Sequence, residues 1–400
     1  MLNSLSIFSL PPGRFLLRVV KDPNLLFRKG GSSMTTIKNF FASRWGIVSA
    51  GVFVGVFAPL LQKWGNPGNM GICVACMERD IAGALGLHRA ALVQYIRPEI
   101  IGFVLGALIA ALLFKEFRPR GGSSPIIRFF LGFFAMVGAL VFLGCPWRAL
   151  LRLAGGDGNA ILGLAGLAAG IWLGVLFLKS GYTLGRATKV MPFSGWVFPI
   201  AMVALLVLLL VAPQFGRTPE GNPTGPIFFS QKGPGSQHAP IIISLLAGLC
   251  VGFLAQRTRL CTMGAIRDVI LIKNTYLLSG ILGIVGAAFI MNLILGQFKA
   301  GFANQPIAHT DYLWNFMGMS LSGLAFALAG GCPGRQLFLS GEGDGDAAIF
   351  ATGMIVGAGF SHNFSMASSA TGPGAYGPIA VIIGLIFCIV VGFTMREKMA

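Results

Sequence analysis

Charged residues are scarce in this chain of 400 residues. Asp, Glu, Lys and Arg together make up 11% of it, only 13 residues are acidic, and hydrophobic residues make up 55%. Soluble domains carry about a quarter charged residues, so this composition excludes a water-soluble globule. It predicts an integral membrane protein.

Histidine is also rare, and the cysteines lack the spacing of metal sites. The four histidines are spread along the chain, and the single Cys-x-x-Cys pair, Cys73 and Cys76, has no second copy. We therefore expect no zinc site. Met77 stands where a c-type haem site needs histidine, and we expect no cofactor. A redox dithiol at Cys73 and Cys76 stays open.

The cysteine count argues against a disulfide framework. Seven is an odd number, and a large membrane core has no need of such bonds. Five of the cysteines fall in or beside repeated motifs. The other two, Cys250 and Cys388, lie in plain apolar runs and are predicted to be core residues.

Apolar runs of about 20 residues are abundant, and each is long enough for a helix that crosses a membrane. We predict an all-α polytopic membrane protein with about ten transmembrane helices, at 46–62, 94–114, 128–143, 160–178, 196–212, 239–255, 276–296, 313–330, 347–361 and 377–394. Loops rich in Lys and Arg alternate with loops poor in charge, which fits the positive-inside rule if both termini are cytoplasmic. The same rule explains the net charge of +17, so nucleic acid is not an expected partner.

Two motifs occur twice. Gly144-Cys145-Pro146-Trp147-Arg148 returns 187 residues later as Gly331-Cys332-Pro333-Gly334-Arg335. Cys73 with Arg79-Asp80 returns 188 residues later as Cys261 with Arg267-Asp268. Five predicted spans per copy is an odd number, so the second copy must be inverted relative to the first, as in many transporters.

The motifs lie in segments too polar and too rich in glycine to cross a membrane alone. We predict four re-entrant half-helices, at 68–90 and 144–156 from outside and at 257–273 and 331–345 from inside. Such backbone is tolerated at membrane depth only where it is buried in protein or lines a cavity. The expected shape is an hourglass path with the half-helices pointing at its waist.

We divide the chain into a basic N-terminal segment (1–44), a first membrane repeat (45–213), an external linker (214–238) and a second, inverted repeat (239–400). Lys29-Gly30-Gly31 ahead of Met34 has the form of a translated ribosome-binding site, which makes Met34 an alternative start. The other interpretation is a basic amphipathic segment on the cytoplasmic leaflet.

The repeated Gly-Cys-Pro-x-Arg motif predicts an anion site. Proline suits the first turn of a helix, which puts Cys145 and Cys332 at or near an N-cap. Unpaired N–H groups and the positive end of the helix dipole meet there. Arg148 and Arg335 follow on the same helical face. The alternative is that each arginine binds backbone carbonyls and each cysteine only packs.

The residues of the second motif are expected to have two different roles. We expect the neighbours Arg79-Asp80 and Arg267-Asp268 to form ion pairs that support the re-entrant segments, and Cys73 and Cys261 to line the path. Cys76 has no counterpart, because Gly264 holds the matching position.

Acidic residues in the membrane are few. Besides Asp80 and Asp268 few such carboxylates are available for a proton relay, which favours facilitated passage. Asp157 and Asp344 match across the repeat, and so do Asn159 and Asp346. They are predicted to begin the following spans as N-caps, with a cation site for a coupling ion as the alternative.

At these motifs the sequence resembles the YeeE/YedE family of membrane proteins, which includes thiosulfate transporters. Asn69-Met70-Gly71-Ile72-Cys73-Val74-Ala75-Cys76 and the motif at Cys145 are most similar to the YedE branch linked to selenium metabolism. The resemblance covers nearly everything after about residue 45. It implies a multi-pass protein of the bacterial inner membrane, with no enzymatic activity of its own.

The resemblance also implies how the path works. Cys73, Cys145, Cys261 and Cys332 are expected to pass a sulfur oxyanion by S–H···S contacts, and a cytosolic TusA/SirA-like (YedF-like) carrier is the implied protein partner. Pro146 and Pro333, followed by Arg148 and Arg335, depart from the better-known thiosulfate carriers, which leaves a selenium species open as substrate.

Three hypotheses follow. The first is a permease for a sulfur- or selenium-containing anion with a path lined by cysteines. The second is a membrane-embedded thiol relay, in which Cys73 and Cys76 hand sulfur or selenium to the carrier. The third is a small-solute channel whose thiols have no role.

Overall fold

The computed structural model describes residues 33–211, 225 and 227–397. Most of the predicted N-terminal segment (1–44), including the amphipathic stretch ahead of Met34, lies outside the described residues, as does about half of the predicted linker (214–238). The described chain is mostly helical and has almost no strand.

Ten long helices make up the body of the part that the structure describes. They are α3 (Arg44–Lys63), α5 (Pro98–Leu113), α6 (Pro125–Phe142), α8 (Asn159–Lys179), α9 (Pro192–Val211), α10 (Ile241–Thr258), α12 (Tyr276–Ile294), α13 (Tyr312–Ala329), α15 (Gly345–Asn363) and α16 (Gly377–Thr394). The remaining elements are short: α2 (Ser33–Ala42), α4 (Val74–Ala84), α7 (Pro146–Ala154), α11 (Thr262–Ile272), α14 (Pro333–Gly341), the 3₁₀ turn η1 (Pro234–Ser236), and the strands β1 (Arg120–Gly121) and β2 (Thr188–Lys189), which pair antiparallel.

Eight helical segments of the described chain are long and apolar enough to cross a membrane. Three of them join a long helix to the short helix after it: Pro125–Ala154, Ile241–Ile272 and Tyr312–Gly341. The long helices α5, with 16 residues, and α15, with 19, are not among the eight. Both lie inside the bundle beside helices that belong to the eight segments, because α5 packs on α10 and α15 packs on α6. The protein is an all-α polytopic membrane protein.

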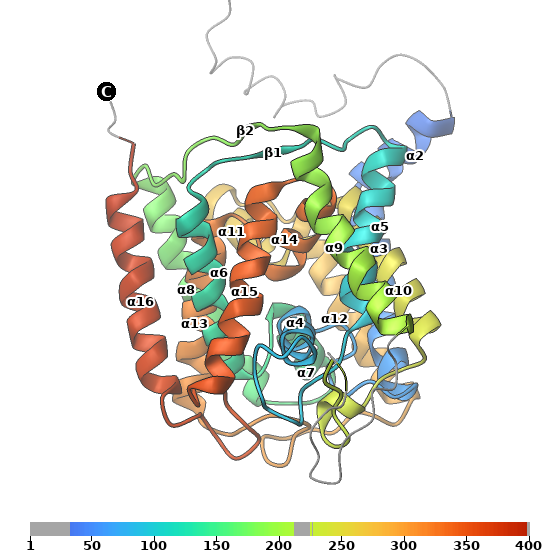
Figure 1. Ribbon diagram of the computed structural model, residues 1–400, viewed down its shortest axis with the longest axis vertical. Helices are drawn as coiled ribbons and strands as arrows, with labels where there is room; N and C mark the ends of the chain where they lie inside the picture. The colour runs from blue at the N-terminus through green and yellow to red at the C-terminus, as the bar shows by residue number, and fades with distance from the viewer. Residues whose placement is uncertain (1–32, 212–224, 226, 398–400) are drawn as a thin grey trace, which may run out of the picture.

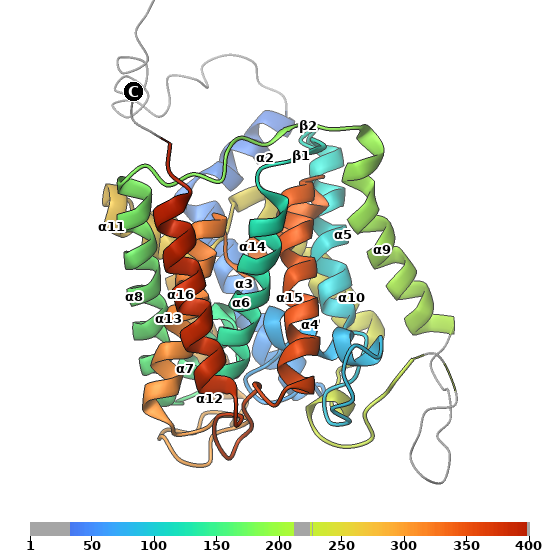
Figure 2. The ribbon, with the colours of Figure 1, turned by 60° about the vertical axis from the view of Figure 1, so that its left-hand side comes forward.

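Helix packing shows the duplication directly. α3 packs on α12 while α10, its counterpart, packs on α5; likewise α6 packs on α15 while α13 packs on α8. Each half therefore supplies partners for the other. In Figures 1 and 2 the short helices α4 and α7 lie below α11 and α14, so corresponding parts of the two halves sit at opposite levels, as inverted repeats require.

The last helix of each half follows this exchange only in part. α9 packs against α5, α14 and α15, whereas α16 packs against α6, α13 and α8. Only the contacts α9–α15 and α16–α8 correspond, so the repeat is less regular at the periphery than among the inner helices.

Glycine lets the inner helices meet backbone to backbone. A Cβ on Gly106 of α5 would collide with the Leu249 carbonyl of α10, and one on Gly252 of α10 would collide with the Phe103 carbonyl of α5. Small residues at such crossings are how helices associate in lipid, where burial of apolar surface gives no driving force.

Both ends of the described chain lie on the same side, the upper one in Figure 1, together with β1 and β2. The loops on this side, at 114–124, 180–191 and 259–261, carry Lys115, Arg118, Arg120, Arg186, Lys189 and Arg259. The described loops on the lower side, at 64–73, 85–97, 227–240, 295–311 and 364–376, carry fewer basic residues, namely Arg89, Arg97, Lys232 and Lys299. The asymmetry of charge that the sequence shows is thus an asymmetry between two faces of the bundle.

Candidate functional site

Four cysteines occupy the N-cap positions of the four short helices: Cys73 before α4, Cys145 before α7, Cys261 before α11 and Cys332 before α14. Pro146 and Pro333 stand at the first position of α7 and α14, where their fixed φ and missing N–H suit the start of a helix. Each thiol is therefore set beside N–H groups that have no partner within the helix.

The cysteines gather in two groups. The lower thiol cluster consists of Cys73, Cys76 and Cys145: the Cys76 N–H donates to Cys73 Sγ at 3.4 Å, and the Cys145 side chain is a neighbour of Cys73. The sequence alone did not show that each half would form its own cluster.

The upper thiol cluster consists of Cys261 and Cys332. Their Sγ atoms are 3.6 Å apart, and Cys261 Sγ also accepts from the N–H groups of Gly264, at 3.3 Å, and Cys332, at 3.5 Å. All five cysteines of the two clusters are free thiols, and none is more than 5% exposed. Both clusters are therefore buried inside the described bundle.

The two motif arginines have different surroundings. Arg148 is fully buried; it donates from Nη1 to Cys76 Sγ at 3.5 Å and to the Leu143 carbonyl, and from Nη2 to the carbonyls of Pro306 and Ile307 at 3.3 and 3.2 Å. No carboxylate of the described chain pairs with it. Carbonyl binding, the alternative interpretation of the sequence, is thus present beside a thiol contact.

Arg335 is instead held by a carboxylate. Its Nη1 lies 3.3 Å from Glu342 Oε1, and Arg259 donates to the same oxygen at 2.7 Å. Arg120 lies 3.8 Å from the other oxygen of Glu342. Sequence reasoning missed Glu342, although the repeat offers a signal: the matching position in the first half is Gly155 (342 − 187).

The Arg-Asp neighbours form ion pairs in both halves. Arg79 donates from Nε and Nη2 to Asp80 Oδ1 at 3.0 and 2.7 Å, and Arg267 donates to Asp268 at 2.8 Å. Asp80 also accepts from Arg97 Nε at 2.8 Å, a partner that sequence reasoning missed. Arg97 in turn donates to the carbonyls of Pro234 and Gln237, which ties α4 to η1.

More carboxyl groups are buried than the sequence suggested. Glu78 of α4 is 1% exposed, and neither of its oxygens has a hydrogen-bond partner in the described chain. Glu99 of α5 is fully buried, accepts from Asn66 through one oxygen at 2.7 Å and leaves the other unpaired. Sequence reasoning named Asp80 and Asp268 and missed these two buried glutamates.

The acidic residues after the motifs have structural partners. Asp344 caps α15 by accepting from the Ala347 N–H at 3.0 Å and pairs with Arg120 at 2.6 Å. Asp157 accepts from the Asn159 N–H at 2.9 Å and pairs with Arg152 at 2.6 Å. Asp346 does not cap a helix; its carboxylate accepts from the N–H groups of Gly122 and Ser123.

Histidine does not add a metal site. The rings of His88 and His362 are neighbours, with centroids 4.5 Å apart, so two of the four histidines are closer than their spread along the sequence indicated. Within the described residues, no group of three or more His, Cys, Asp or Glu side chains could hold a metal ion.

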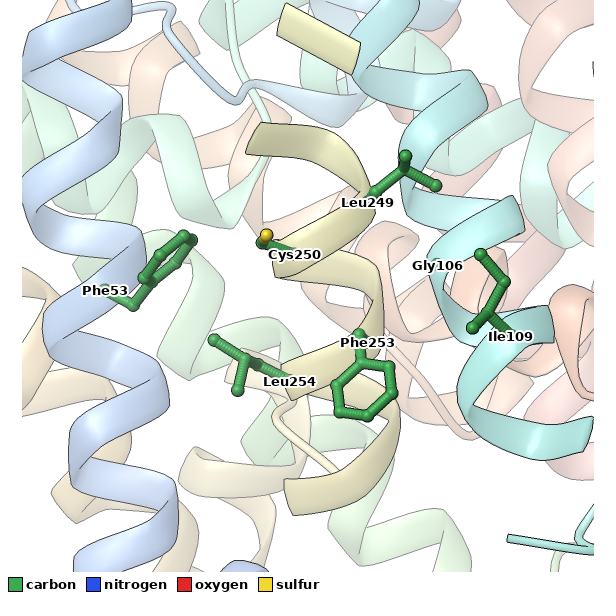
Figure 3. A pocket seen from close by; sticks show the side chains of 7 residues that line it. All are labelled: Phe53, Gly106, Ile109, Leu249, Cys250, Phe253 and Leu254. Atoms are coloured by element: carbon green, nitrogen blue, oxygen red, sulfur yellow. The ribbon is translucent and has the colours of Figure 1, made fainter. Parts of the chain in front are cut away.

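The two remaining cysteines lie apart from the clusters. Cys388 is fully buried, as predicted, but Cys250 is exposed, so its assignment to the core is wrong. Cys250 lines an apolar hollow of about 320 Å³ between α3, α5 and α10, together with Phe53, Ile109 and Phe253 (Figure 3). None of the five clustered cysteines lines this hollow, which faces outward from the bundle.

Comparison with known proteins gives the chain a family. The family model described as "Sulphur transport" matches residues 4–173 and 257–394. The chain is also similar to two proteins named thiosulfate transporter TsuA: the Escherichia coli protein is 28% identical over 103 residues, and the Spirochaeta thermophila protein is 32% identical over 99 residues. These segments cover 26% and 25% of this chain and 29% of each relative, so the chain matches under a third of either relative's length. The family model covers more than half of the chain, and the chain therefore belongs to the sulphur transport (YeeE/YedE) family.

Proposed function

We propose that this protein is a permease that passes a small sulfur oxyanion, with thiosulfate as the first candidate, through the two thiol clusters. The observation that carries the proposal is the placing of four cysteines at the N-caps of four short buried helices. Helix N-termini bind anions, and thiols add weak contacts to a soft sulfur atom. The names of both relatives support thiosulfate as the ligand.

The short helices act in this proposal as re-entrant segments. α4 and α7 enter from the lower face and α11 and α14 from the upper face, so that both clusters lie inside the membrane. Non-helical backbone such as 68–73 and 143–145 is tolerated at that depth because protein surrounds it. The positive-inside rule then places the basic upper face, together with both termini, on the cytoplasmic side of a bacterial inner membrane.

In this proposal, the positive charge of Arg148 attracts the anion to the lower thiol cluster. Arg148 is fully buried, contacts Cys76 Sγ and lacks a carboxylate partner, so the lower thiol cluster carries net positive charge. Weak, repeated contacts along the path let the ion leave as readily as it enters, which conduction requires.

The thiol relay is the second hypothesis, and the structure gives it less support. Cys73 and Cys76 are both 0% exposed, and a TusA/SirA-like carrier would need access to a thiol. A persulfide or mixed disulfide trapped on either residue and detected by mass spectrometry would favour the relay over the permease.

Uptake into proteoliposomes tests the proposal. Radiolabelled thiosulfate, sulfite, sulfate and selenite are compared side by side, which also decides between a sulfur and a selenium substrate. We expect Cys145→Ala and Cys332→Ala to abolish uptake while the protein still inserts. Cys250→Ala, which changes a thiol outside both clusters, is the matched control and should transport normally. Normal uptake by both cluster variants would refute the role of the thiols.

A further inference from the structure

Trp147 lies between the helix that begins at Cys145 and the helix that begins at Cys332. It stands two residues after Cys145, and the matching residue in the second half, two after Cys332, is Gly334. The indole lies over this glycine: a Cβ placed on Gly334 would be 3.4 Å from Cζ2 of Trp147. The motif therefore differs between its copies at the point where the copies touch.

Aromatic packing fixes the indole in this place. The ring centroid of Trp147 lies 5.9 Å from that of Phe103 on α5 and 6.0 Å from that of Phe338 on α14, and Phe103 and Phe338 are 5.9 Å apart. Trp147 is 2% exposed and both phenylalanines are fully buried. Three rings from α5, α7 and α14 thus fill the space where the helix that begins at Cys145 meets the helix that begins at Cys332.

The polar atom of this ring has no partner. Trp147 Nε1 is buried and makes no hydrogen bond within the described chain. Thr262, the residue after Cys261, has a buried hydroxyl that also makes no hydrogen bond within the described chain. The Nε of Arg148, the residue after Trp147, is likewise buried and unpaired there. Buried donors are nearly always paired, and leaving one unpaired is unfavourable. Within the described chain, three buried donors next to clustered cysteines are thus free to bind an acceptor.

We infer that the Trp147 indole N–H donates a hydrogen bond to an oxygen atom of the anion as the anion passes from one thiol cluster to the other. This inference rests on the proposed function and adds a specificity-determining residue to it. A sulfur oxyanion can make both kinds of contact, because its terminal oxygens accept hydrogen bonds from N–H groups while its sulfur contacts thiols. The three rings close the same point to other solutes when no anion is present.

Removal of the N–H alone tests the inference. Trp147→Phe keeps an aromatic ring over Gly334 but has no donor, and loss of a hydrogen bond to a charged acceptor weakens binding at least about tenfold. We expect KM for thiosulfate uptake to rise by that factor, with maximal uptake less affected. Thr262→Val, which removes a hydroxyl at nearly constant volume, provides a second and gentler variant with the same expected direction.

Trp172→Phe is the matched control, because Trp172 lies on α8 and is 52% exposed. It should leave KM unchanged. Proteoliposomes in which Trp147→Phe transports thiosulfate with the KM of the unaltered protein would overturn the inference and leave the permease intact. If the unaltered protein takes up none of the tested oxyanions, the proposed function itself fails.

Discussion

Glu342 gives a prediction whose size follows from its contacts. Its carboxylate is 4% exposed and faces Arg259 at 2.7 Å and Arg335 at 3.3 Å through one oxygen, with Arg120 3.8 Å from the other. In Glu342→Gln this negative charge is lost and the side chain keeps nearly the same shape. Arg335, whose side chain is 14% exposed, then has no carboxylate partner.

The expected loss of stability is about 3 kcal/mol. Two unit charges 3.3 Å apart attract by about 5 kcal/mol at an effective dielectric constant of about 20. Removal of one partner from a buried pair is destabilising by about 3–5 kcal/mol. We take the lower end because the Arg259 side chain is 45% exposed, and exposed pairs contribute little.

The permease proposal adds a second expectation. In Glu342→Gln the freed Arg335 can pair with a bound anion, so the variant should bind thiosulfate more tightly than the unaltered protein. A ligand at about 100 times its Kd stabilises a protein by about 2.7 kcal/mol, and each tenfold decrease in Kd adds about 1.4 kcal/mol at fixed ligand concentration. Thiosulfate should therefore restore much of the lost stability.

Thermal unfolding of the detergent-solubilised protein, with and without thiosulfate, measures both effects. Glu342→Gln should unfold at a lower temperature than the unaltered protein and show the larger upward shift with thiosulfate. Glu397→Gln, at an exposed glutamate near the end of α16, should match the unaltered protein. A Glu342→Gln variant whose melting temperature and thiosulfate shift both equal those of the control refutes the reasoning.

Two further predictions concern buried carboxyl groups of the short helices. Asp80→Asn leaves Arg79 and Arg97 without this counterion in a site that is 0–3% exposed, and should lower the free energy of unfolding by about 3–5 kcal/mol. The variant should therefore aggregate in size-exclusion chromatography. Asp268→Asn changes a pair whose side chains are 31% and 18% exposed, and this control should elute as a single peak. Glu78→Met replaces a carboxyl group that has no partner, so the melting temperature should stay the same or rise, and a marked fall would show that Glu78 has a partner in the folded protein.

The long helices could be predicted from the sequence because each is a continuous apolar run. The predicted span 313–330 is α13 within one residue at each end, and 377–394 is α16. The span 94–114 began four residues before α5, because Gln94, Tyr95 and Ile96 are apolar or uncharged but lead into Pro98, which starts the helix. The N-cap positions of Cys145 and Cys332 were also predictable, since proline directly after each one favours the first turn.

Contacts between distant segments could not be predicted in the same way. Arg97 reaches Asp80 across 17 residues, and Arg259 reaches Glu342 across 83; nothing in the local sequence selects these partners from the other charges. Cys250 was misplaced for a related reason, because an apolar run has the same composition whether a residue faces the bundle or the lipid. Only the packing of α10 against α5 decides which side is exposed.

Residues that differ between the two repeats give the two thiol clusters different surroundings. Among the positions that differ between the short helices of the two halves, three bear on packing and charge at the thiol clusters: Trp147 against Gly334, Gly155 against Glu342, and Cys76 against Gly264. The first fills the contact between the halves, and the second adds a carboxylate to the upper arginine alone. The third adds a thiol beside the lower arginine, Arg148, which no carboxylate neutralises.

These differences make the two ends of the proposed path unequal in charge. An anion entering from the lower face meets Arg148, whose hydrogen-bond partners in the described residues are carbonyls and a thiol, with no carboxylate among them. An anion at the upper cluster meets Arg335 with the carboxylate of Glu342 beside it, which repels the anion and weakens its attraction to that guanidinium. Binding is thus favoured at the first cluster and release at the second. A symmetric pair of motifs would hold the anion equally at both ends, and the repeat departs from symmetry at the residues that prevent this.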